Sequence, residues 1–561
     1  MTDNATALAV SSAVSIADQL PDQPTFGQVL RVLGFDSAEC DRFEHIVLPF
    51  RPFSHQLRGL LKGLQEVRFG LSFEPRTGKT LVMQMLAIYF AYHGSGTMVI
   101  MPPALFRQYT ADFQKIQGHG LNIVVMNGSP AAREKLLTSW EKRPSTRPHV
   151  CLMSREIFKG LWHRCYFMNF QSVHFDESHL GLQSATSQIA KEIRAYANQN
   201  ENNRLVLSTG TPIPNLIINA FCAAHLLDRY SYPTQRAFNS AHVLFKSICV
   251  AGTWTATRTI MVPDRYINLD KLHDSMAAHS SYASKLETLN LEAPNVQVVP
   301  CDLQPKHRTL YNKVLSERIL ELGREMDEKG LPFDEDNGER EILDARSAQK
   351  LRMVALQLIS NPGEFCQTDA HGQPVIKPAD NAIYQTTRAL LDSVNAADKE
   401  KVVLFCTFTK TVEGLSNLLK DLNPAIAYGP LGPDKSAKEV ERFQTDPSCR
   451  VLIGNWASIG TGFTLGHISQ TVIFVEPVSN PGAFDQCLSR VMIVGQKLPV
   501  VAYILCVNNT ISPLAIDAMI DKSLDINQVI RSKRTLLDSL HGKKIKYSKV
   551  TAAEMEAALA A

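Results

Sequence analysis

The sequence predicts an α/β protein with two parallel-sheet domains in tandem and a mostly helical insert between them. The chain has 561 residues, which is longer than one hydrophobic core usually organises. Short runs of β-branched and aliphatic residues alternate with helical patterns up to about residue 227, and the same alternation returns at Lys401. This alternation is typical of parallel sheets whose strands are connected by helices.

The predicted strands are short apolar runs, each bounded by polar or turn-forming residues. In the first domain they are Phe69–Phe73, Met98–Met101, Ile123–Met126, Val150–Met153, Val173–Phe175 and Leu205–Ser208. In the second domain they are Val402–Cys406, Val451–Gly454, Thr471–Glu476 and Val500–Val507, with a helix expected at Val412–Leu422. The two domains are therefore expected to share a fold class without sharing sequence.

The patterns divide the chain into five regions. We expect an N-terminal accessory region at 1–45, a first sheet domain at 46–230, a mostly helical insert or linker at 231–380, a second sheet domain at 381–530 and a basic tail at 531–561. The insert carries an acidic stretch that is typical of a solvated helix and loop. The tail is interpreted either as a solvated segment or as a contact for nucleic acid.

Composition excludes several classes of protein. Eleven cysteines occur without a Cys-x-x-Cys pair, which favours reduced thiols over a disulfide framework or a zinc site. Residues 1–20 lack the basic cluster of a secretory signal. The apolar run Leu81–Tyr92 is shorter than the roughly 20 residues of a membrane helix, so it predicts a buried helix. We expect an intracellular protein without membrane contact.

A candidate phosphate-binding loop lies between a predicted strand and a predicted helix, with the sequence EPRTGKT at 74–80. Backbone N–H groups at Thr77 and Gly78, together with the helix N-terminus, would favour anionic phosphate. Lys79 would reach the β- and γ-phosphates of ATP, and the Thr80 hydroxyl would bind Mg²⁺. The loop therefore predicts nucleotide binding.

Two adjacent carboxylates strengthen this prediction. Phe73 occupies the position of the usual first glycine of the phosphate-loop pattern, so the loop alone leaves open a coincidental turn. Asp176 and Glu177 follow a predicted strand about a hundred residues later, where Asp176 would hold Mg²⁺ through water and Glu177 would polarise the attacking water. His179 is interpreted as a residue that couples the nucleotide site to the neighbouring domain.

A third polar segment follows the strand that ends at Ser208. Thr209, Gly210 and Thr211 would form a hinge that senses the γ-phosphate, although the same residues also form ordinary turns. The phosphate loop, the acid pair and this segment occur in the order that phosphoryl-transfer chemistry on an α/β sheet requires.

In this order the segments resemble the motifs of superfamily two helicases, specifically of the Swi/Snf-type DNA translocases. The resemblance extends from about Phe50 to Ser512. It implies two RecA-like lobes that hydrolyse ATP with Mg²⁺ in the cleft between them, and duplex DNA as the partner. It also favours a compact bacterial, viral or bacteriophage form of the family.

The resemblance assigns further roles in the first lobe. Gln56 lies in a segment, RPFSHQ, that is similar to the family's adenine-reading segment. Pro102, Ser154 and Arg155 lie in segments that resemble the strand ends holding one nucleic-acid backbone, and such contacts to phosphate do not read bases.

The resemblance continues through the second lobe. Thr407 follows the strand that opens this lobe, and Thr461 and Gly462 lie in an alanine- and glycine-rich segment; all three are implied nucleic-acid contacts. Gln486 would bind the nucleotide, and Arg490 would stabilise the charge of phosphoryl transfer.

One departure from the family pattern affects the expected activity. The second arginine of the family's last motif corresponds to Ile493 in this sequence, which predicts slow or partner-dependent hydrolysis. The expected function is an ATP-driven motor on duplex DNA, with strand-separating helicase activity as its nearest alternative. A nucleotide-gated nucleic-acid clamp and an interaction scaffold stay open, as do DNA-bound protein partners.

Overall fold

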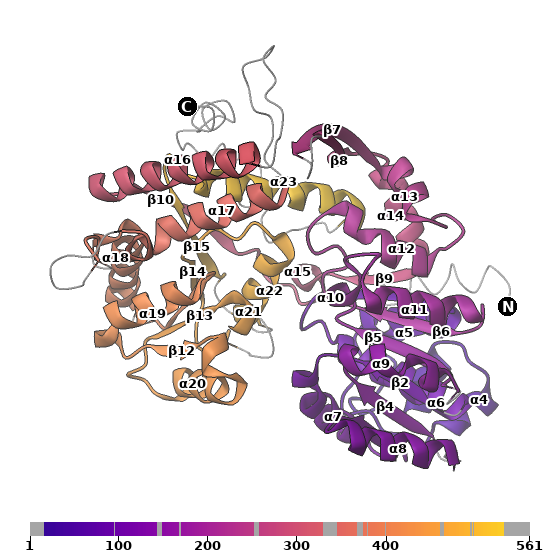
Figure 1. Cartoon of the computed structure of the whole chain (residues 1–561). Helices are drawn as coiled ribbons and strands as arrows, with labels where there is room; N and C mark the ends of the chain where they lie inside the picture. The colour runs from indigo at the N-terminus through magenta and orange to yellow at the C-terminus, as the bar shows by residue number, and fades with distance from the viewer. Residues whose placement is uncertain are drawn as a thin grey trace. The chain divides into compact units, whose positions relative to one another are not determined.

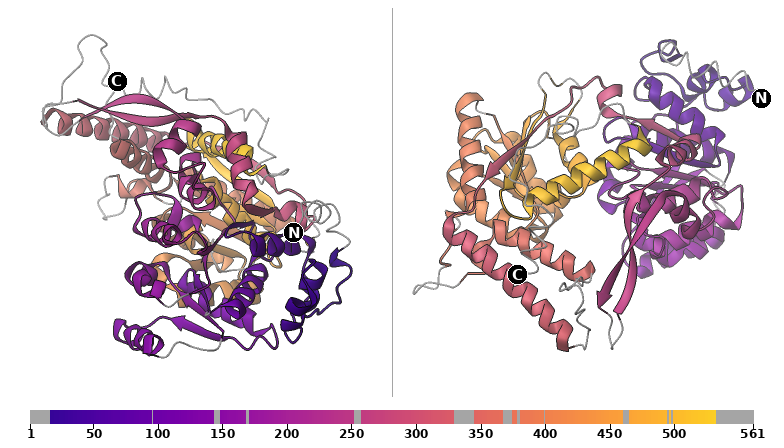
Figure 2. Two further views of the ribbon diagram at one scale, coloured as in Figure 1. Left: turned by 90° about the vertical axis from the view of Figure 1, so that its right-hand side faces the viewer. Right: turned by 90° about the horizontal axis from the view of Figure 1, so that it is seen from above.

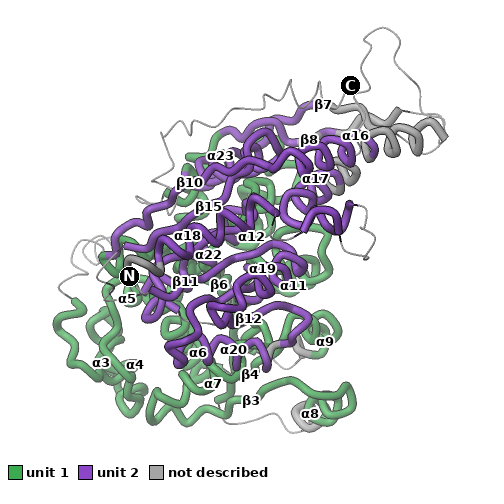
Figure 3. The backbone as a smooth tube through the Cα atoms, turned by 90° about the vertical axis from the view of Figure 1, so that its left-hand side faces the viewer, with its two compact units in different colours: residues 1–242, 268–290, 528–533 green, residues 243–267, 291–527, 534–561 purple. Residues whose placement is uncertain are grey.

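The computed structural model describes residues 16–94, 96–142, 148–167, 170–251, 257–328, 345–366, 374–377, 380–398, 400–459, 465–493, 496 and 499–531. The chain divides into two compact units, which Figure 3 distinguishes by colour. Unit 1 consists of residues 1–242, 268–290 and 528–533, and unit 2 consists of residues 243–267, 291–527 and 534–561.

Unit 1 is built on a parallel sheet of seven strands in the order β3-β4-β2-β5-β6-β1-β9. Figure 1 labels β2, β4, β5, β6 and β9 of this sheet. The strands are β1 (Arg68–Phe73), β2 (Thr97–Ile100), β3 (Asn122–Met126), β4 (His149–Met153), β5 (Ser172–Asp176), β6 (Arg204–Ser208) and β9 (Ser280–Ala283). Strands β4, β5 and β6 are buried along almost their whole length, as expected for a parallel sheet covered on both faces.

Helices flank this sheet. They are α3 (Phe26–Val32), α4 (Ser37–Arg42), α5 (Ser54–Gln65), α6 (Lys79–His93), η1 (Pro103–Leu105), α7 (Phe106–Gln114), α8 (Pro130–Lys142), α9 (Arg155–Phe167), α10 (His179–Leu182), α11 (Gln188–Gln199), η2 (Ile217–Ala220), α12 (Phe221–Leu227), α13 (Gln235–His242), α14 (Leu269–Ala278) and α15 (Lys285–Thr288).

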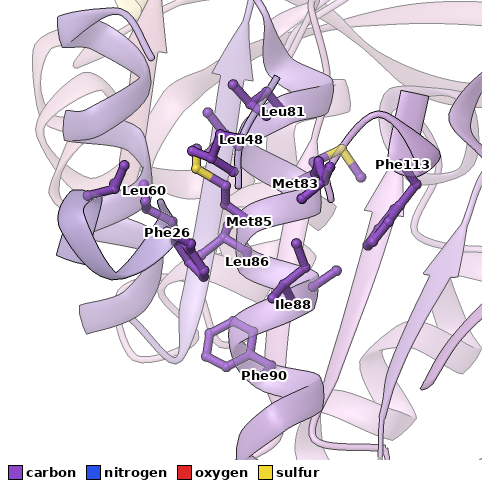
Figure 4. Close-up of a cluster of buried hydrophobic side chains, with 14 of the residues drawn as sticks. Phe26, Leu48, Leu60, Leu81, Met83, Met85, Leu86, Ile88, Phe90 and Phe113 are labelled. Carbon is purple, nitrogen blue, oxygen red and sulfur yellow. The ribbon is translucent and has the colours of Figure 1, made fainter. Parts of the chain in front are cut away.

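The α6 helix forms the centre of the unit 1 core. It is apolar around most of its circumference, and its buried residues run from Leu81 to Ala91, which is typical of a helix enclosed by protein. Figure 4 shows side chains of other elements gathered around it, including Phe26 of α3, Leu60 of α5 and Phe113 of α7. The burial of α6 holds its first residue, Lys79, at the edge of the sheet.

Unit 2 contains a second parallel sheet, of six strands in the order β10-β15-β14-β11-β13-β12. The strands are β10 (Asn295–Cys301), β11 (Val402–Cys406), β12 (Ala425–Ala427), β13 (Val451–Asn455), β14 (Thr471–Phe474) and β15 (Val501–Val507). A separate antiparallel hairpin, visible as a two-stranded ribbon in Figure 2, pairs β7 (Val243–Ala251) with β8 (Thr257–Tyr266).

The helices of unit 2 pack around a core of their own, which includes Leu358, Leu404 and Leu505. They are α16 (Pro305–Glu328), α17 (Ala345–Ser360), η3 (Pro362–Glu364), α18 (Ala382–Asp398), α19 (Thr409–Leu418), η5 (Lys420–Leu422), η6 (Gly429–Leu431), α20 (Pro433–Thr445), α21 (Trp456–Ile459) and α22 (Pro481–Val491). Helix α23 (Ser512–Ile530) follows β15.

The predicted fold class is confirmed: two parallel α/β sheets occur in tandem. Every strand predicted from the apolar runs is present, and the run at Leu81–Tyr92 is the buried helix α6. We expected residues 231–380 to form a mostly helical insert. In the structure, two strands of this region belong to the parallel sheets: β9 joins the sheet of unit 1 and β10 joins the sheet of unit 2. Among the residues that the structure describes, no helix is both long enough and apolar enough to cross a membrane.

Candidate nucleotide-binding site

The three predicted polar segments meet at one edge of the unit 1 sheet. The phosphate loop, Glu74–Thr80, follows β1; the acid pair, Asp176 and Glu177, lies at the end of β5; and the hinge loop, Thr209–Thr211, follows β6. Strands β5, β6 and β1 are neighbours in the parallel sheet, so their carboxyl ends lie side by side. This edge is where open α/β sheets bind ligands.

The phosphate loop has a backbone conformation suited to anions. Arg76 and Gly78 both adopt left-handed conformations, with φ of 74° and 82°. Left-handed residues in such a turn direct successive N–H groups toward one side, which creates an anion-binding concavity. Glycine takes this conformation without steric cost, whereas a side chain at Arg76 is strained.

Helix α5 fixes the phosphate loop from one side. His55 Nε2 lies 2.6 Å from Thr77 O, and Gln56 Nε2 donates to Gly78 O at 3.0 Å. The other end of the Gln56 amide accepts from Phe53 N at 2.8 Å, and the residue is fully buried. Gln56 therefore holds the phosphate loop in this structure, and its contact with adenine stays a prediction.

Strand β9 fixes the phosphate loop from the other side. Glu74 N donates to Ala283 O at 3.0 Å. The Glu74 carboxylate accepts from the Tyr282 hydroxyl at 2.7 Å and from Lys285 N at 2.9 Å. Hydrogen bonds to an ionised acceptor are stronger than neutral ones, so β9 and the start of α15 anchor the first residue of the loop.

Lys79 and the acid pair form the charged centre of the site. Lys79 Nζ lies 3.0 Å from Asp176 Oδ1 and 3.1 Å from Glu177 Oε1. Burial alone would lower the pKa of Lys79, but the two carboxylates raise it above its ordinary value. Burial raises the pKa of Asp176 despite the attraction of Lys79. A buried lysine paired with two carboxylates favours the binding of a ligand that brings further charge.

The acid pair is linked to the hinge loop through His179. His179 Nδ1 lies 2.8 Å from Thr209 Oγ1 and 3.4 Å from Glu177 Oε2. Burial lowers the pKa of His179 to about 4, so the imidazole is neutral at physiological pH. A second link runs through Ser208, whose hydroxyl donates to Asp176 Oδ1 at 3.1 Å.

The hinge loop touches the phosphate loop directly. A Cβ atom on Gly210 would lie 2.7 Å from Pro75 Cδ, so only glycine permits this approach. Thr211 N donates to Thr209 Oγ1 at 3.0 Å, which closes the turn. The hinge loop thus contacts the phosphate loop through Gly210 and His179 through Thr209, and its sensing of the γ-phosphate stays a prediction.

The donor set fits Mg²⁺ bound together with phosphate. In the described part of the chain no three His, Cys, Asp or Glu side chains are grouped to hold a metal. Mg²⁺ usually takes one or two protein oxygens and completes its shell with phosphates and water. Thr80 at the start of α6 and the Asp176 carboxylate supply such oxygens, while Lys79 Nζ shows that a cation is accommodated beside Asp176.

The predicted nucleic-acid contacts of unit 1 also follow strand ends. Pro102 follows β2, and Ser154 and Arg155 follow β4. The Ser154 hydroxyl accepts from Ile157 N at 3.2 Å and thereby caps α9, while Arg155 Nη1 donates to Leu180 O at 2.8 Å. These residues lie at the same edge of the sheet as the nucleotide site, and their nucleic-acid contacts stay predictions.

In unit 2 the predicted residues lie in two places. Thr407 follows β11, and its N–H donates to Glu476 Oε2 at 2.9 Å. Gln486 and Arg490 lie one turn apart on α22. The predicted contacts Thr461 and Gly462 fall outside the described residues. Their assigned roles, and those of Thr407, Gln486 and Arg490, stay predictions.

Ile493 is a packing residue of unit 2. Its side chain is 7% exposed, and its Cγ2 atom would lie 2.7 Å from a Cβ atom added to Gly466. The position that departs from the family pattern is therefore filled by an apolar group in the interior, which brings no charge to a phosphate.

Comparison with known proteins assigns the family. Residues 54–349, just over half of the chain, match the SNF2-related domain, and residues 384–495 match the helicase conserved C-terminal domain. This chain belongs to the SNF2-related family. It therefore carries the two ATPase lobes of a Swi/Snf-type motor, in a family that uses ATP.

Curated SNF2-related relatives are distant. The TATA-binding protein-associated factor mot1 of Schizosaccharomyces pombe is 24% identical over 423 residues, which cover 68% of this chain and 20% of that protein. The CHD3-type chromatin-remodeling factor CHR7 of Arabidopsis thaliana is 22% identical over 86% of this chain and 38% of that protein. The DNA repair and recombination protein RAD54-like of Drosophila persimilis is 22% identical over 74% of this chain and 53% of that protein.

The chain spans only about a fifth to a half of the length of these relatives. Among solved structures, the Sulfolobus solfataricus SWI2/SNF2 ATPase core in complex with dsDNA matches with a TM-score of 0.35 and 14% identity. That match covers 85% of this chain and 96% of that one. The family assignment rests on the two domain matches.

Several residues of the SNF2-related site were not predicted from the sequence. His55, Ser208, Tyr282 and Lys285 all contact the phosphate loop or the acid pair. His55 directly precedes the predicted Gln56, and Ser208 directly precedes the predicted Thr209, so these two residues could have been found from their position next to predicted ones. Tyr282 lies in a strand of four residues with two serines, which carries too little apolar pattern to be recognised.

Proposed function

We propose that this SNF2-related chain is a duplex-DNA-dependent ATPase that uses Mg²⁺ and translocates along the duplex inside the cell. The observation that carries the proposal is the placement of Lys79 Nζ between Asp176 and Glu177, at 3.0 and 3.1 Å. A buried lysine beside two carboxylates, at the mouth of an anion-binding loop, is the arrangement that phosphoryl transfer from a nucleotide requires.

The residues of the site have separate roles in hydrolysis. Backbone N–H groups of the phosphate loop and Lys79 hold the β- and γ-phosphates, and Glu177 orients and polarises the attacking water. Thr80 and Asp176 would hold Mg²⁺, which when bound neutralises phosphate charge. The His179–Thr209 contact links the acid pair to the hinge loop. A change at the acid pair during hydrolysis would therefore move the hinge loop, which would couple hydrolysis to movement on DNA.

Duplex DNA is proposed as the substrate because the family's motors act on it and because the predicted contacts at Pro102, Ser154, Arg155 and Thr407 suit a phosphate backbone. Contacts of this kind give weak sequence preference and steep salt dependence. DNA-bound proteins are proposed as further partners that such a motor would displace. A nucleotide-gated clamp is the second candidate, and the buried Ile493 favours it.

The first test measures Mg²⁺-dependent ATP hydrolysis without nucleic acid and with duplex DNA, single-stranded DNA or RNA. We expect the strongest stimulation by duplex, and its loss in Lys79→Ala and Glu177→Gln. Lys115→Ala is the matched control, because Lys115 is exposed and pairs with Asp112 three residues away. Stimulation by RNA alone would contradict the duplex assignment.

The same samples separate the motor from the clamp. A motor displaces a third strand from a DNA triplex while it hydrolyses ATP, whereas a clamp binds ATP and DNA without turnover. Binding of both ligands with no hydrolysis under any condition would replace the proposed function with the clamp.

A further inference from the structure

The sheet of unit 2 has a point where the order of its strands reverses. After β11 the chain forms β12 and β13 on one side of that strand, and β14 then lies on its other side. Strand β11 is parallel to both β13 and β14, so the carboxyl ends of these three strands lie at the same edge. Open α/β sheets bind ligands at such a reversal, beside the carboxyl ends of the strands. The residues that follow β11 and β14 therefore mark a candidate site in unit 2.

Thr407, the first residue after β11, is held through its backbone by residues of both neighbouring strands. Its N–H donates to Glu476 Oε2 at 2.9 Å, in the loop after β14. Its carbonyl accepts from Asn455 Nδ2 at 3.2 Å, at the end of β13. In the part of the chain that the structure describes, no hydrogen bond uses the hydroxyl of Thr407, and this residue is half-buried. Both backbone groups of Thr407 are thus fixed, while its hydroxyl is available to a ligand.

Glu476 is a buried carboxylate that accepts hydrogen bonds on both oxygens. It is 1% exposed, and its Oε1 accepts from the Thr411 hydroxyl of α19. Thr411 Oγ1 in turn accepts from Asn361 Nδ2 at 2.9 Å, and Asn361 Oδ1 accepts from the Tyr384 hydroxyl at 3.3 Å. Buried polar networks whose members are satisfied rigidify the segments that they join. This network joins the loop after β11 to α19, to α18 and to the residue that follows α17.

We propose that Glu476 and Asn455 are positioning residues for nucleic acid, which hold the Thr407 backbone so that the Thr407 hydroxyl donates to a phosphate of the duplex. This inference rests on the proposed function and adds two residues that act through Thr407 without touching DNA. Hydroxyl groups make such phosphate contacts without reading bases. A hydroxyl on a fixed backbone loses less freedom on binding than one on a mobile loop, so loosening either anchor weakens duplex binding.

The charge state of Glu476 determines how firmly it holds Thr407. An ionised carboxylate accepts hydrogen bonds on both oxygens, whereas the protonated acid uses one of them as a donor. Burial raises the pKa of Glu476 to about 7, so the group is ionised at pH 8 and protonated at pH 5.5. The ionisable groups that face it are Cys406 of β11 and Tyr384 of α18, and burial raises the pKa of both above their ordinary values. The anchor on Thr407 is therefore stronger at pH 8.

The decisive variant is Glu476→Gln, which keeps the shape of the side chain and replaces one acceptor with a donor, as protonation does. At pH 8 we expect its Kd for a labelled duplex at fixed salt to rise about tenfold, the cost of one weakened hydrogen bond to a charged group. At pH 5.5 the wild type is itself protonated, so the two Kd values should converge. The amide also removes a buried charge, so the urea midpoint of the variant at pH 8 should be no lower than that of the wild type. A merely structural role would move affinity and stability together.

Glu400→Gln is the matched control. The Glu400 carboxylate also accepts from a backbone N–H and a threonine hydroxyl, those of Gln470 at 2.6 Å and Thr471 at 3.0 Å. Thr471 is the first residue of β14, so these contacts lie at the end of the strand opposite to Glu476. This variant should bind duplex like the wild type at both pH values.

A double-mutant cycle shows whether Glu476 acts through Thr407. Thr407→Val removes the hydroxyl and keeps the shape of the side chain, so the Kd for duplex should rise about tenfold. Adding Glu476→Gln to Thr407→Val should cause little further loss, because there is no hydroxyl left to position, whereas independent sites would add. Asn455→Ala removes the anchor on the Thr407 carbonyl and should behave in the same way. It also keeps the test open if the Glu476 variant does not fold.

Each outcome supports or overturns a distinct conclusion. Unchanged duplex affinity in Glu476→Gln and Asn455→Ala, beside a wild-type chain that binds duplex and hydrolyses ATP, overturns the positioning assignment alone. Additive losses in the double variants also overturn it, because the residues then act independently of Thr407. Weaker binding of a non-hydrolysable ATP analogue with duplex affinity intact assigns the phosphate to the nucleotide and overturns the contact with DNA. A wild-type chain that neither binds duplex nor hydrolyses ATP overturns the proposed function and this inference together.

Discussion

Single residues of the phosphate loop show how tightly its backbone is specified. Gly78 and Arg76 take left-handed conformations, and Gly78 also lies too close to a neighbouring side chain to leave room for a methyl group. A Cβ atom at Gly78 would lie 2.0 Å from Gln56 Nε2. The glycine is therefore required twice, by its φ and by the close approach of Gln56, which itself holds the loop through Gly78 O.

Gly78→Ala is expected to weaken ATP binding at least tenfold. The methyl group displaces the Gln56 amide and breaks its bond to Gly78 O, and the left-handed alanine costs about 1 kcal/mol more. Gly34→Ala is the matched control, because Gly34 has a φ of 87° and no atom within 4 Å of its would-be Cβ. Calorimetric titration with an ATP analogue should show loss of affinity in the first variant only.

Secondary-structure elements determine what the sequence could and could not predict. Strand β6 contains the apolar run Leu205–Leu207, and strand β5 contains Val173 and Phe175, so their ends, and with them Asp176 and Thr209, could be placed from the sequence. Strand β9 has only four residues, half of them serine, and it pairs with β1 across roughly two hundred residues of chain. Its position depends on long-range packing that local pattern does not encode, so the anchor at Tyr282 was not foreseen.

The contribution of β9 can be tested through Tyr282→Phe. This variant removes the 2.7 Å hydrogen bond to Glu74 and keeps the aromatic ring, so the phosphate loop should loosen without collapse of the sheet. We expect ATP affinity to fall about tenfold, equivalent to about 1.4 kcal/mol. Equal affinities in the variant and the wild type would show that β1 and α5 suffice to hold the loop.

Tyr92→Phe controls for the loss of a hydroxyl. Tyr92 donates to His119 O at 2.9 Å, away from the phosphate loop, so this variant loses a comparable hydrogen bond in the same unit. It should lower the stability of unit 1 slightly and leave ATP affinity unchanged.

At the scale of the whole molecule, two buried titratable groups, one in each unit, have pKa values shifted in opposite directions. In unit 1, burial lowers the pKa of His174 from 6.5 to about 3; its Nε2 lies 3.3 Å from Ser172 Oγ. In unit 2, burial raises the pKa of Glu476 from 4.5 to about 7, although hydrogen bonds from Thr411 and Thr407 oppose the shift. Because each unit has its own core, the units should respond to pH separately.

The expected directions follow from proton linkage. The unfolded chain binds a proton at His174 below pH 6.5 and the folded chain does not, so stability of unit 1 that is present above pH 6.5 is lost as the pH falls, by about 2 kcal/mol between pH 7 and pH 5. Glu476 behaves oppositely: its contribution is full below pH 4.5 and is lost as the pH rises through 7, by about 2 kcal/mol between pH 5.5 and pH 8.

Differential scanning calorimetry across pH 5 to 8 would check both directions at once. We expect two transitions, one that moves to lower temperature in acid and one that moves to lower temperature in base. His174→Leu should flatten the acid response of the first transition only, and Glu476→Gln should flatten the alkaline response of the second only. A single transition altered by both variants would show that the units unfold as one cooperative body. In that case the same transition must respond to the protonation of buried groups in both units.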